Sequence, residues 1–348
     1  MYTINLSART TMKKEFKKTD IAQVITDTFA AQIQGWIDDG VEAPRWSMPW
    51  VNKGNGECWP IRADGTPYRG TNVFWLWMVA SQQGYSSNQW FGFGAAKEAS
   101  AKAAREQGRN IETRDRKRGK GQYYWDVDND CLFEGGVRKG EKATPVVFYK
   151  KIEVEDKKAV TENGDPAKKF IPLLKYYNVF NRDQIEGLPA IETDATVVEF
   201  DSVAAAEAVI EGFDLPLNEG GNRAYYSPSL DEYHVPGRDQ FNSPGEFYAA
   251  VFHEQGHATG HKSRLDRLKK AEFGSKEYAF EELVAELTAA FVCAETGVEG
   301  RIQHVEYLAH WLKVLGEDKN AIIRASSKAQ AAADYIMGRE PVQYAKAA

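Results

Sequence analysis

The stretch SPGEFYAAVFHEQGHATGH, residues 243–261, predicts a helix with a well-defined beginning. Ser243 is a typical N-cap, Pro244 suits the first helical position, and Glu246, three residues after the cap, predicts a capping box. The apolar letters FYAAVF that follow supply a stripe for burial. We therefore expect a partly buried helix whose polar residues, HEQGH, lie near its C-terminal end.

These polar letters form the pattern H-E-x-x-H at His253, Glu254 and His257. Residues four apart lie one turn apart on the same face of a helix, so both histidines can bind one metal ion. Glu254 projects beside them and is the predicted catalytic base. A catalytic zinc ion takes three protein ligands and keeps one position for water. The sequence must therefore supply a third ligand elsewhere.

Two kinds of third ligand are available. His261 lies a further helical turn along, so we expect it to be an outer partner or an alternative ligand, and Ser263 excludes the metzincin pattern. Residues 278–297, YAFEELVAELTAAFVCAETG, predict a second helix with Glu282 and Glu286 one turn apart, as in gluzincins. Glu282 is the predicted ligand, and Glu286 is predicted to hydrogen-bond a ligand histidine. The exchange of these two roles stays an open alternative.

The composition is that of a folded protein. The chain has 348 residues, 43% of them hydrophobic, which favours two domains. The first residues lack the apolar segment of a signal peptide, and no run of about 18 apolar residues occurs, so we expect a cytoplasmic protein with no membrane partner. Three scattered cysteines without a C-x-x-C pattern argue against cysteine-bound zinc.

Charge and tryptophan are unevenly distributed. Residues 1–190 hold 29 Lys and Arg against 24 Asp and Glu, or +5; the remainder holds 44 − 29 = 15 against 50 − 24 = 26, or −11. Eight of the nine tryptophans lie before residue 190. A basic half with many aromatic residues suits a single-stranded nucleic acid, because cations follow phosphates and exposed rings stack on bases. The alternative is a solvated basic surface with its aromatic residues in the core.

Helical and strand-like segments alternate along residues 1–190 and predict an α+β domain. Helices are expected at 19–40, 73–83 and 95–107, a strand near 90–93, a tight hairpin at 135–142 and a strand from 144. Residues 197–348 predict a second, mostly helical domain with a small β-sheet. A hairpin at 225–235 precedes the H-E-x-x-H helix, and two amphipathic helices separated at 316–319 follow.

With these motifs in hand, the chain resembles the ArdC-type antirestriction proteins of plasmids and phages. The resemblance rests on PRWSMPW, YRGTN, GGVRKGEK and YNVFNRDQIEGLP in the first half, and on HEQGHATGHKSRLDR and EELVAEL in the second. It implies an N-terminal single-stranded-DNA-binding domain and a C-terminal zincin-like metallopeptidase domain. It also implies protection of incoming DNA from host restriction. Residues 109–134 depart from the family pattern as a charged, aromatic insertion.

Two functions follow, and the sequence leaves both open. In the first, Zn²⁺, or another divalent transition metal, on His253, His257 and Glu282 supports peptide hydrolysis, with Glu254 as base and a restriction enzyme or another host protein as substrate. In the second, the metal site is structural and the protein only coats single-stranded DNA. A nuclease fits H-E-x-x-H poorly. The predicted DNA contacts are Trp46, Trp50 and Trp90 for stacking, and Arg69, Arg116, Lys117, Arg118, Arg138, Lys139 and Lys142 for phosphates.

Overall fold

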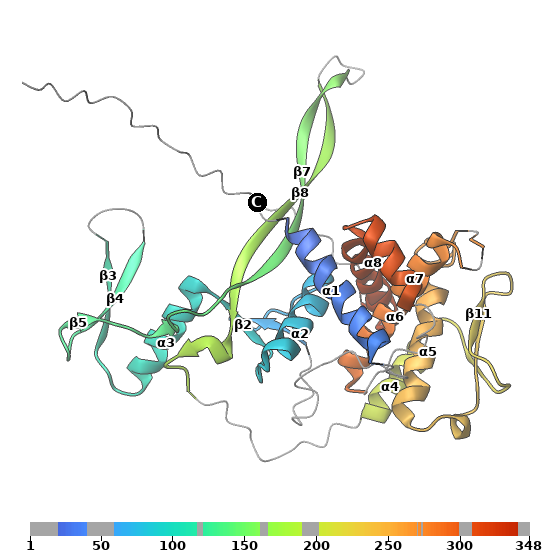
Figure 1. Ribbon diagram of the computed structural model, residues 1–348, viewed down its shortest axis with the longest axis horizontal. Helices are drawn as coiled ribbons and strands as arrows, with labels where there is room; N and C mark the ends of the chain where they lie inside the picture. The colour runs from blue at the N-terminus through green and yellow to red at the C-terminus, as the bar shows by residue number, and fades with distance from the viewer. Residues whose placement is uncertain are drawn as a thin grey trace, which may run out of the picture.

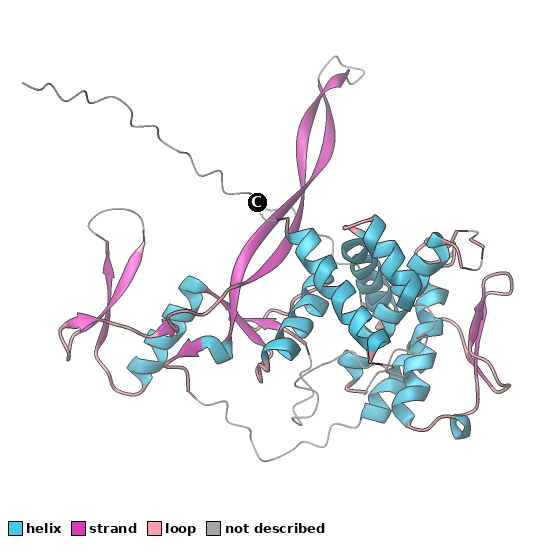
Figure 2. Ribbon diagram, viewed as in Figure 1, coloured by secondary structure: helices cyan, strands magenta, loops and turns pink. Residues whose placement is uncertain are grey.

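The computed structural model describes residues 20–39, 59–116, 121–160, 166–189, 202–269, 271–272, 274–298 and 308–339. Four of the predicted DNA contacts lie outside these residues, and so does the segment 191–196 between the two predicted domains. The four contacts are Trp46, Trp50, Lys117 and Arg118. The architecture is α+β, with most helices gathered on one side of the molecule and most strands on the other (Figures 1 and 2).

Two helices open the described chain. Helix α1 (Ile21–Asp38) begins at the N-cap Asp20, whose carboxylate accepts a hydrogen bond from the amide of Gln23. Its buried residues recur at helical spacing and form one apolar stripe. Helix α2 (Thr71–Gln83) is apolar over most of its surface, and it ends at Gly84 with φ of 68°, a left-handed conformation that favours glycine.

The central sheet of the N-terminal half has the order β1-β2-β8-β7. Strand β1 (Ile61–Arg62) pairs parallel with β2 (Gln89–Gly92), and β2 pairs antiparallel with β8 (Pro166–Asn181). Strand β7 (Thr144–Val160) pairs antiparallel with β8 along most of its length. This long hairpin projects beyond the helices (Figure 1).

Helix α3 (Phe93–Glu106) leads into the segment 109–134, which folds as a meander of β3 (Ile111–Asp115), β4 (Gln122–Asp126) and β5 (Cys131–Leu132). The hairpin predicted at 135–142 is wrong. Strand β6 (Gly136–Val137) pairs instead with β9 (Ile185–Glu186), which follows a short 3-10 helix at Arg182–Gln184. Local glycines suggested a turn, but pairing across about fifty residues satisfies the backbone here.

The C-terminal half begins with α4 (Ser202–Gly212) and a three-stranded sheet of order β10-β12-β11. Strand β10 (Leu217–Glu219) pairs parallel with β12 (Glu232–Val235), which forms the predicted hairpin with β11 (Tyr225–Ser227). A 3-10 turn at Arg238–Gln240 precedes the remaining helices. These are α5 (Pro244–Thr259), α6 (Lys276–Thr296), α7 (Leu308–Glu317) and α8 (Ala321–Ile336).

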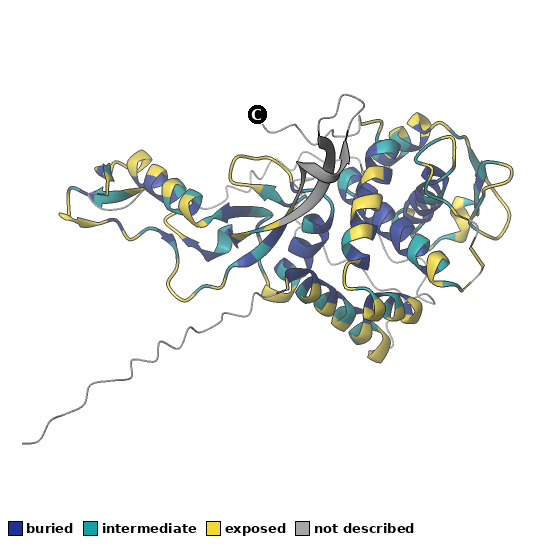
Figure 3. Cartoon of the chain, turned by 90° about the horizontal axis from the view of Figure 1, so that it is seen from above, coloured by how far each residue is buried: buried dark blue, intermediate teal, exposed yellow. Residues whose placement is uncertain are grey.

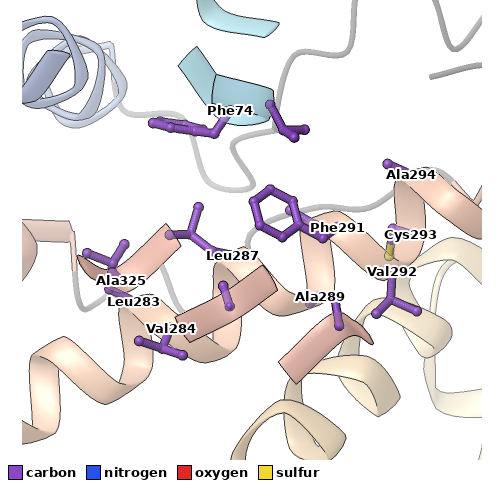
Figure 4. Packing of buried hydrophobic residues seen from close by; sticks show 14 of the residues in the cluster. Phe74, Leu283, Val284, Leu287, Ala289, Phe291, Val292, Cys293, Ala294 and Ala325 are labelled. Atoms are coloured by element: carbon purple, nitrogen blue, oxygen red, sulfur yellow. The ribbon is translucent and has the colours of Figure 1, made fainter. Parts of the chain in front are cut away.

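One large hydrophobic core crosses the predicted domain boundary. Phe29 of α1 packs edge-on against Phe74 of α2, with ring centroids 4.7 Å apart, and both join a core that includes α6 and α8. Figure 4 shows Phe74 facing Leu287 and Phe291 of α6, and Figure 3 shows buried residues concentrated between these helices. The helices α1 and α2 therefore depend on the C-terminal half for burial. None of the described helices is long and apolar enough to cross a bilayer.

Candidate metal centre

Helix α5 begins as the sequence predicts. The hydroxyl of Ser243 accepts a hydrogen bond from the amide of Glu246 at 3.3 Å, and Pro244 occupies the first turn. The reciprocal half of the predicted capping box differs, because the Glu246 carboxylate accepts from the amide of Asn242 at 3.2 Å. The helix is then buried from Phe247 to Gly256, and this carries His253 and Glu254 into the interior, where they are 1% and 3% exposed.

A glycine within H-E-x-x-H allows α5 and α6 to pack closely. A Cβ atom on Gly256 would lie 3.3 Å from Cα of Ala285 and 3.3 Å from Cβ of Thr288 on α6. Such contacts are tighter than ordinary van der Waals separation, so only a residue without a side chain fits comfortably. The close approach places the acidic residues of α6 within reach of the histidines of α5.

His253, His257 and Glu282 form a group that could hold a metal ion, with ligand atoms all within 4.8 Å of one another. The two Nε2 atoms lie 3.1 Å apart. Glu282 places one carboxylate oxygen 3.5 Å from Nε2 of His253 and the other 3.6 Å from Nε2 of His257. Ligand atoms about 2.0–2.2 Å from a zinc ion lie roughly 3–4 Å from one another. The three residues therefore fit a divalent transition metal in both donor type and spacing.

A second carboxylate faces the other nitrogen of each histidine. Oε1 of Glu286 lies 3.6 Å from Nδ1 of His253, and Oε1 of Glu281 lies 3.4 Å from Nδ1 of His257. Carboxylates in this position fix the ring orientation of metal-binding histidines and increase their basicity. Glu286 thus lies on the outer side of the His253 ring, while Glu282 lies on the side where the two Nε2 atoms meet.

Arg267 secures Glu281. Its guanidinium donates to both oxygens of the Glu281 carboxylate, most closely at 2.7 and 2.9 Å, and to the carbonyl of Gly256 at 2.6 Å. The side chain of Arg267 is only 5% exposed, so this charge-assisted network lies inside the protein. The network joins the loop after α5, the turn that contains Gly256, and α6.

The protonation of the group follows from burial and from these carboxylates. Burial lowers the pKa of His253 below its ordinary value, which favours the neutral ring that binds metal. Burial also acts on His257, but the charges of Glu282 and Glu281 outweigh it and raise the pKa of His257 well above the ordinary range. Burial raises the pKa of Glu282, yet the two histidines hold it below its usual value, so Glu282 is a carboxylate.

The group opens on a cavity of about 940 Å³, whose wall includes His253, Glu254, His257 and Glu282. Tyr225 and Tyr226 of β11 line it on one side. The hairpin is fixed to the end of α5 by the buried Arg264, which binds the Asp231 carboxylate and donates to the carbonyl of Ala258 at 2.7 Å. A chain bound in this cavity would lie between the hairpin and the predicted catalytic base.

His261 lies outside the metal-binding group found among the described residues. Helix α5 ends at Thr259, so His261 is in the following turn, where Nδ1 is 2.7 Å from the hydroxyl of Ser263 and 3.5 Å from Asp231. It also lines the cavity. The positions of His261 and Glu286 therefore suit outer partners better than ligands.

Comparison with known proteins identifies both halves. Residues 19–180 match the family model of the N-terminal domain of anti-restriction factor ArdC, and residues 204–328 match that of a zincin-like metallopeptidase. The crystal structure of the antirestriction ArdC protein from plasmid R388, free of metal, is 34% identical with a TM-score of 0.64, over 93% of this chain and 100% of that one. This chain belongs to the ArdC family. The predicted two-part α+β architecture is confirmed.

Another crystal structure and two further proteins are also similar to this chain. The Mn(II)-bound structure of R388 ArdC is also 34% identical, with a TM-score of 0.62 over 92% of this chain and 98% of that one. Protein y4eC of Sinorhizobium fredii (strain NBRC 101917 / NGR234) is 31% identical over 92% of this chain and 93% of its own length. DNA primase TraC of Escherichia coli is 32% identical over 86% of this chain, which spans 26% of TraC.

Two of the DNA contacts predicted for this ArdC-family chain are corrected. Trp90 is 1% exposed and packs against Tyr85 in the core, so its ring is not available to a base. Arg69 forms an ion pair with Asp334 of α8, in which the Arg69 side chain is 35% and the Asp334 side chain 7% exposed, so the charge expected to meet a phosphate is already compensated within the protein. The YRGTN motif that contains Arg69 is a structural junction, because the amide of Gly70 also donates to Gln330 at 2.9 Å.

The other described cations keep their predicted exposure. Arg116, Arg138, Lys139 and Lys142 are all on the surface. Arg138 is also held by Glu141 and donates to the carbonyl of Asp183 at 2.5 Å. Its charge is therefore partly compensated within the protein, while the two lysines have no ion pair among the residues that the structure describes.

Sequence reasoning missed three residues of the centre. The position of Glu281 behind His257, its hydrogen bonds with Arg267 and the close contact of Gly256 with α6 were not predicted from the sequence. The adjacent pair Glu281–Glu282 is a usable signal, since two successive carboxylates on a buried helix need separate partners. Arg267 is too far from Glu281 in sequence for any pattern to pair them.

Proposed function

We propose that this chain protects incoming DNA of a plasmid or phage from host restriction in the cytoplasm of the recipient cell. The N-terminal half binds single-stranded DNA, and the C-terminal half hydrolyses a host protein. The single observation that supports hydrolysis is the joint position of His253, His257, Glu282 and Glu254 in the wall of one large cavity. Membership of the ArdC family supports the antirestriction role.

His253, His257 and Glu282 would hold the metal, which we propose is Zn²⁺. When bound, such an ion supplies Lewis acidity to a carbonyl oxygen and lowers the pKa of water. Glu254 accepts a proton from the attacking water and delivers it to the leaving amine. Glu281 and Glu286 keep the two imidazole rings oriented, and Arg267 keeps Glu281 in place. The β11 edge beside the cavity orients the peptide.

The decisive experiment compares the wild type with Glu254→Ala in a lysate of restriction-proficient recipient cells. Proteins lost with the wild type and retained with the variant are substrates, and N-terminal sequencing of their fragments gives the cleaved bonds. Antirestriction is measured in parallel as the survival of transferred DNA. Protection that persists in the variant, with no protein cleaved by the wild type, would refute proteolysis and leave a protein that coats DNA.

A further inference from the structure

We propose that the exposed rings of Phe148 and Tyr177, with Lys175 beside them, form the surface on which single-stranded DNA stacks. This inference rests on the proposed function that the N-terminal half binds single-stranded DNA, and it names the site. Trp90, the predicted stacking residue that the structure describes, is buried, so base stacking needs rings elsewhere.

Strand pairing places these residues on one face of the β7–β8 hairpin. Phe148 lies directly opposite Lys175, and Val146 directly opposite Tyr177. Directly opposite residues of antiparallel strands share a face, and so do residues two apart on one strand. Phe148, Lys175 and Tyr177 are therefore neighbours on the same face, and the two rings meet edge to face with centroids 6.1 Å apart.

The two rings are exposed where the hairpin leaves the core. Val146 and Val179 on the same face are 6% and 5% exposed, whereas Phe148 is 42% and Tyr177 54% exposed. Figure 1 shows that the β7–β8 hairpin extends beyond the helices. Two adjoining large rings that are open to solvent form a contiguous apolar patch, and such patches mark interaction sites. Their edge-to-face contact holds each ring in one orientation, which reduces the entropy lost when a base stacks.

The charge of this face suits phosphate. Lys175 is exposed and has no ion pair in the described part of the chain. Lys139 and Lys142 lie just before β7 begins, and both are exposed. Acidic residues are absent from the described side chains that share this face of β7 and β8, namely Thr144, Val146, Phe148, Lys175, Tyr177, Val179 and Asn181. A single-strand site needs two components, aromatic rings on which bases stack and cations that bind phosphates, and both are present on this face.

A second aromatic surface is less suitable. Tyr123 and Trp125 of β4 also meet edge to face, but both are only partly exposed. The guanidinium of Arg114 lies over the Trp125 ring, 4.9 Å from its centroid, and is bound to Glu112. The face of Trp125 is therefore already covered by a cation within the protein, so we use this residue as the comparison.

The test measures the binding of a fluorescently labelled oligothymidylate to the full-length chain by anisotropy, at several salt concentrations. Phe148→Ala and Tyr177→Ala should each weaken binding by between about 5- and 150-fold, the range for one stacked base, with little change in the salt slope. Lys175→Gln should reduce the log–log slope by about 0.7. Tyr177→Phe, which keeps the ring, and Trp125→Ala should bind as the wild type does.

The outcomes separate the site from the proposed function. No binding by the folded wild type at micromolar protein and low salt would refute single-strand binding itself. Binding by the wild type that is unchanged in the double variant of Phe148 and Tyr177 would overturn this site alone. So would a loss confined to Trp125→Ala. Both substituted rings are exposed, so we expect the variants to fold. The circular dichroism spectrum of each variant checks that weaker binding is not caused by unfolding.

Discussion

Glu281 faces Nδ1 of His257 across 3.4 Å, while the adjacent Glu282 faces Nε2 of the same ring across 3.6 Å. Two successive residues of one helix thus reach opposite edges of one imidazole. Arg267 makes this arrangement stable, since its hydrogen bonds hold Glu281 on the outer side. The division of roles among the three glutamates of α6 follows from which ring nitrogen each one meets.

Glu281→Gln should weaken metal binding by about 10- to 100-fold, the usual effect of losing a carboxylate behind a ligand histidine. The neutral amide is a weaker acceptor for the imidazole N–H and leaves Arg267 without a full counter-charge. Competition with a chromophoric chelator measures the affinity. Glu277→Gln, an exposed carboxylate in the first turn of the same helix, is the control and should bind metal as the wild type does. Equal metal affinities of Glu281→Gln and Glu277→Gln would show that Glu281 does not support metal binding.

Elemental analysis should find one divalent transition metal per wild-type chain, and little in His253→Ala or His257→Ala. Each substitution removes one of the three residues that form the metal-binding group. Glu282→Ala should lose more metal than Glu286→Ala, because Glu282 meets both Nε2 atoms and Glu286 meets an outer Nδ1. The reverse order would exchange the roles of these two glutamates.

Glu254→Gln should retain the metal and the fold but reduce peptide hydrolysis by about 10²- to 10⁴-fold, since an amide cannot accept the proton of water. The side chain is 3% exposed, and glutamine has nearly the same shape, so packing is preserved. Turnover is followed with a substrate identified in the lysate experiment. Full activity in Glu254→Gln would assign the base to another residue.

Two helical glycines offer a matched test of the contact between α5 and α6. Gly35→Ala on α1 should raise the free energy of unfolding by about 0.5–1 kcal/mol, because no atom of the described residues, apart from the backbone of the helix itself, lies within 4 Å of the new Cβ. Gly256→Ala should gain nothing and should fall below the wild type, since its Cβ meets Ala285 and Thr288 at 3.3 Å. Urea unfolding measures both. An equal increase in the free energy of unfolding in both variants would mean that α6 shifts to accommodate the new Cβ without loss of stability.

The ion pair between Asp231 and Arg264 should make stability depend on pH. The hydrogen bond from Arg264 is the main cause that lowers the pKa of Asp231 in the folded state. Its contribution is therefore complete above the unfolded pKa of about 3.9 and is lost as the pH falls through the lower folded value. Asp231→Asn should cost about 1.5–3 kcal/mol at neutral pH, because Arg264 is 3% exposed and loses its counter-charge.

The difference between Asp231→Asn and the wild type should shrink as the pH falls below about 4. Asp266→Asn is the control: Asp266 also has a positive φ, of 47°, which asparagine tolerates, and its side chain is exposed. Urea unfolding at pH 7, 5 and 3.5 gives the free energies. A cost that is constant over this range would assign the effect of Asp231 to packing rather than to charge.

Residues close together along the chain were largely predictable. The helix from Pro244, its cap at Ser243, the hairpin before it and the two closing helices are all confirmed, because caps, turns and apolar periodicity act over a few residues. The motif His253, Glu254 and His257 needs only helical geometry. The family resemblance, carried by several such local motifs, is confirmed by the comparisons.

Contacts between distant segments were decided by the tertiary structure alone. The pairing of β6 with β9, the internal ion pair of Arg69 with Asp334 and the burial of Trp90 each reverse a prediction made from local sequence. A basic or aromatic residue looks the same in sequence whether it meets solvent or a partner more than two hundred residues away. Its exposure depends on how whole helices and strands pack against one another. This packing requires close fit between surfaces from distant parts of the chain, which local sequence patterns do not specify.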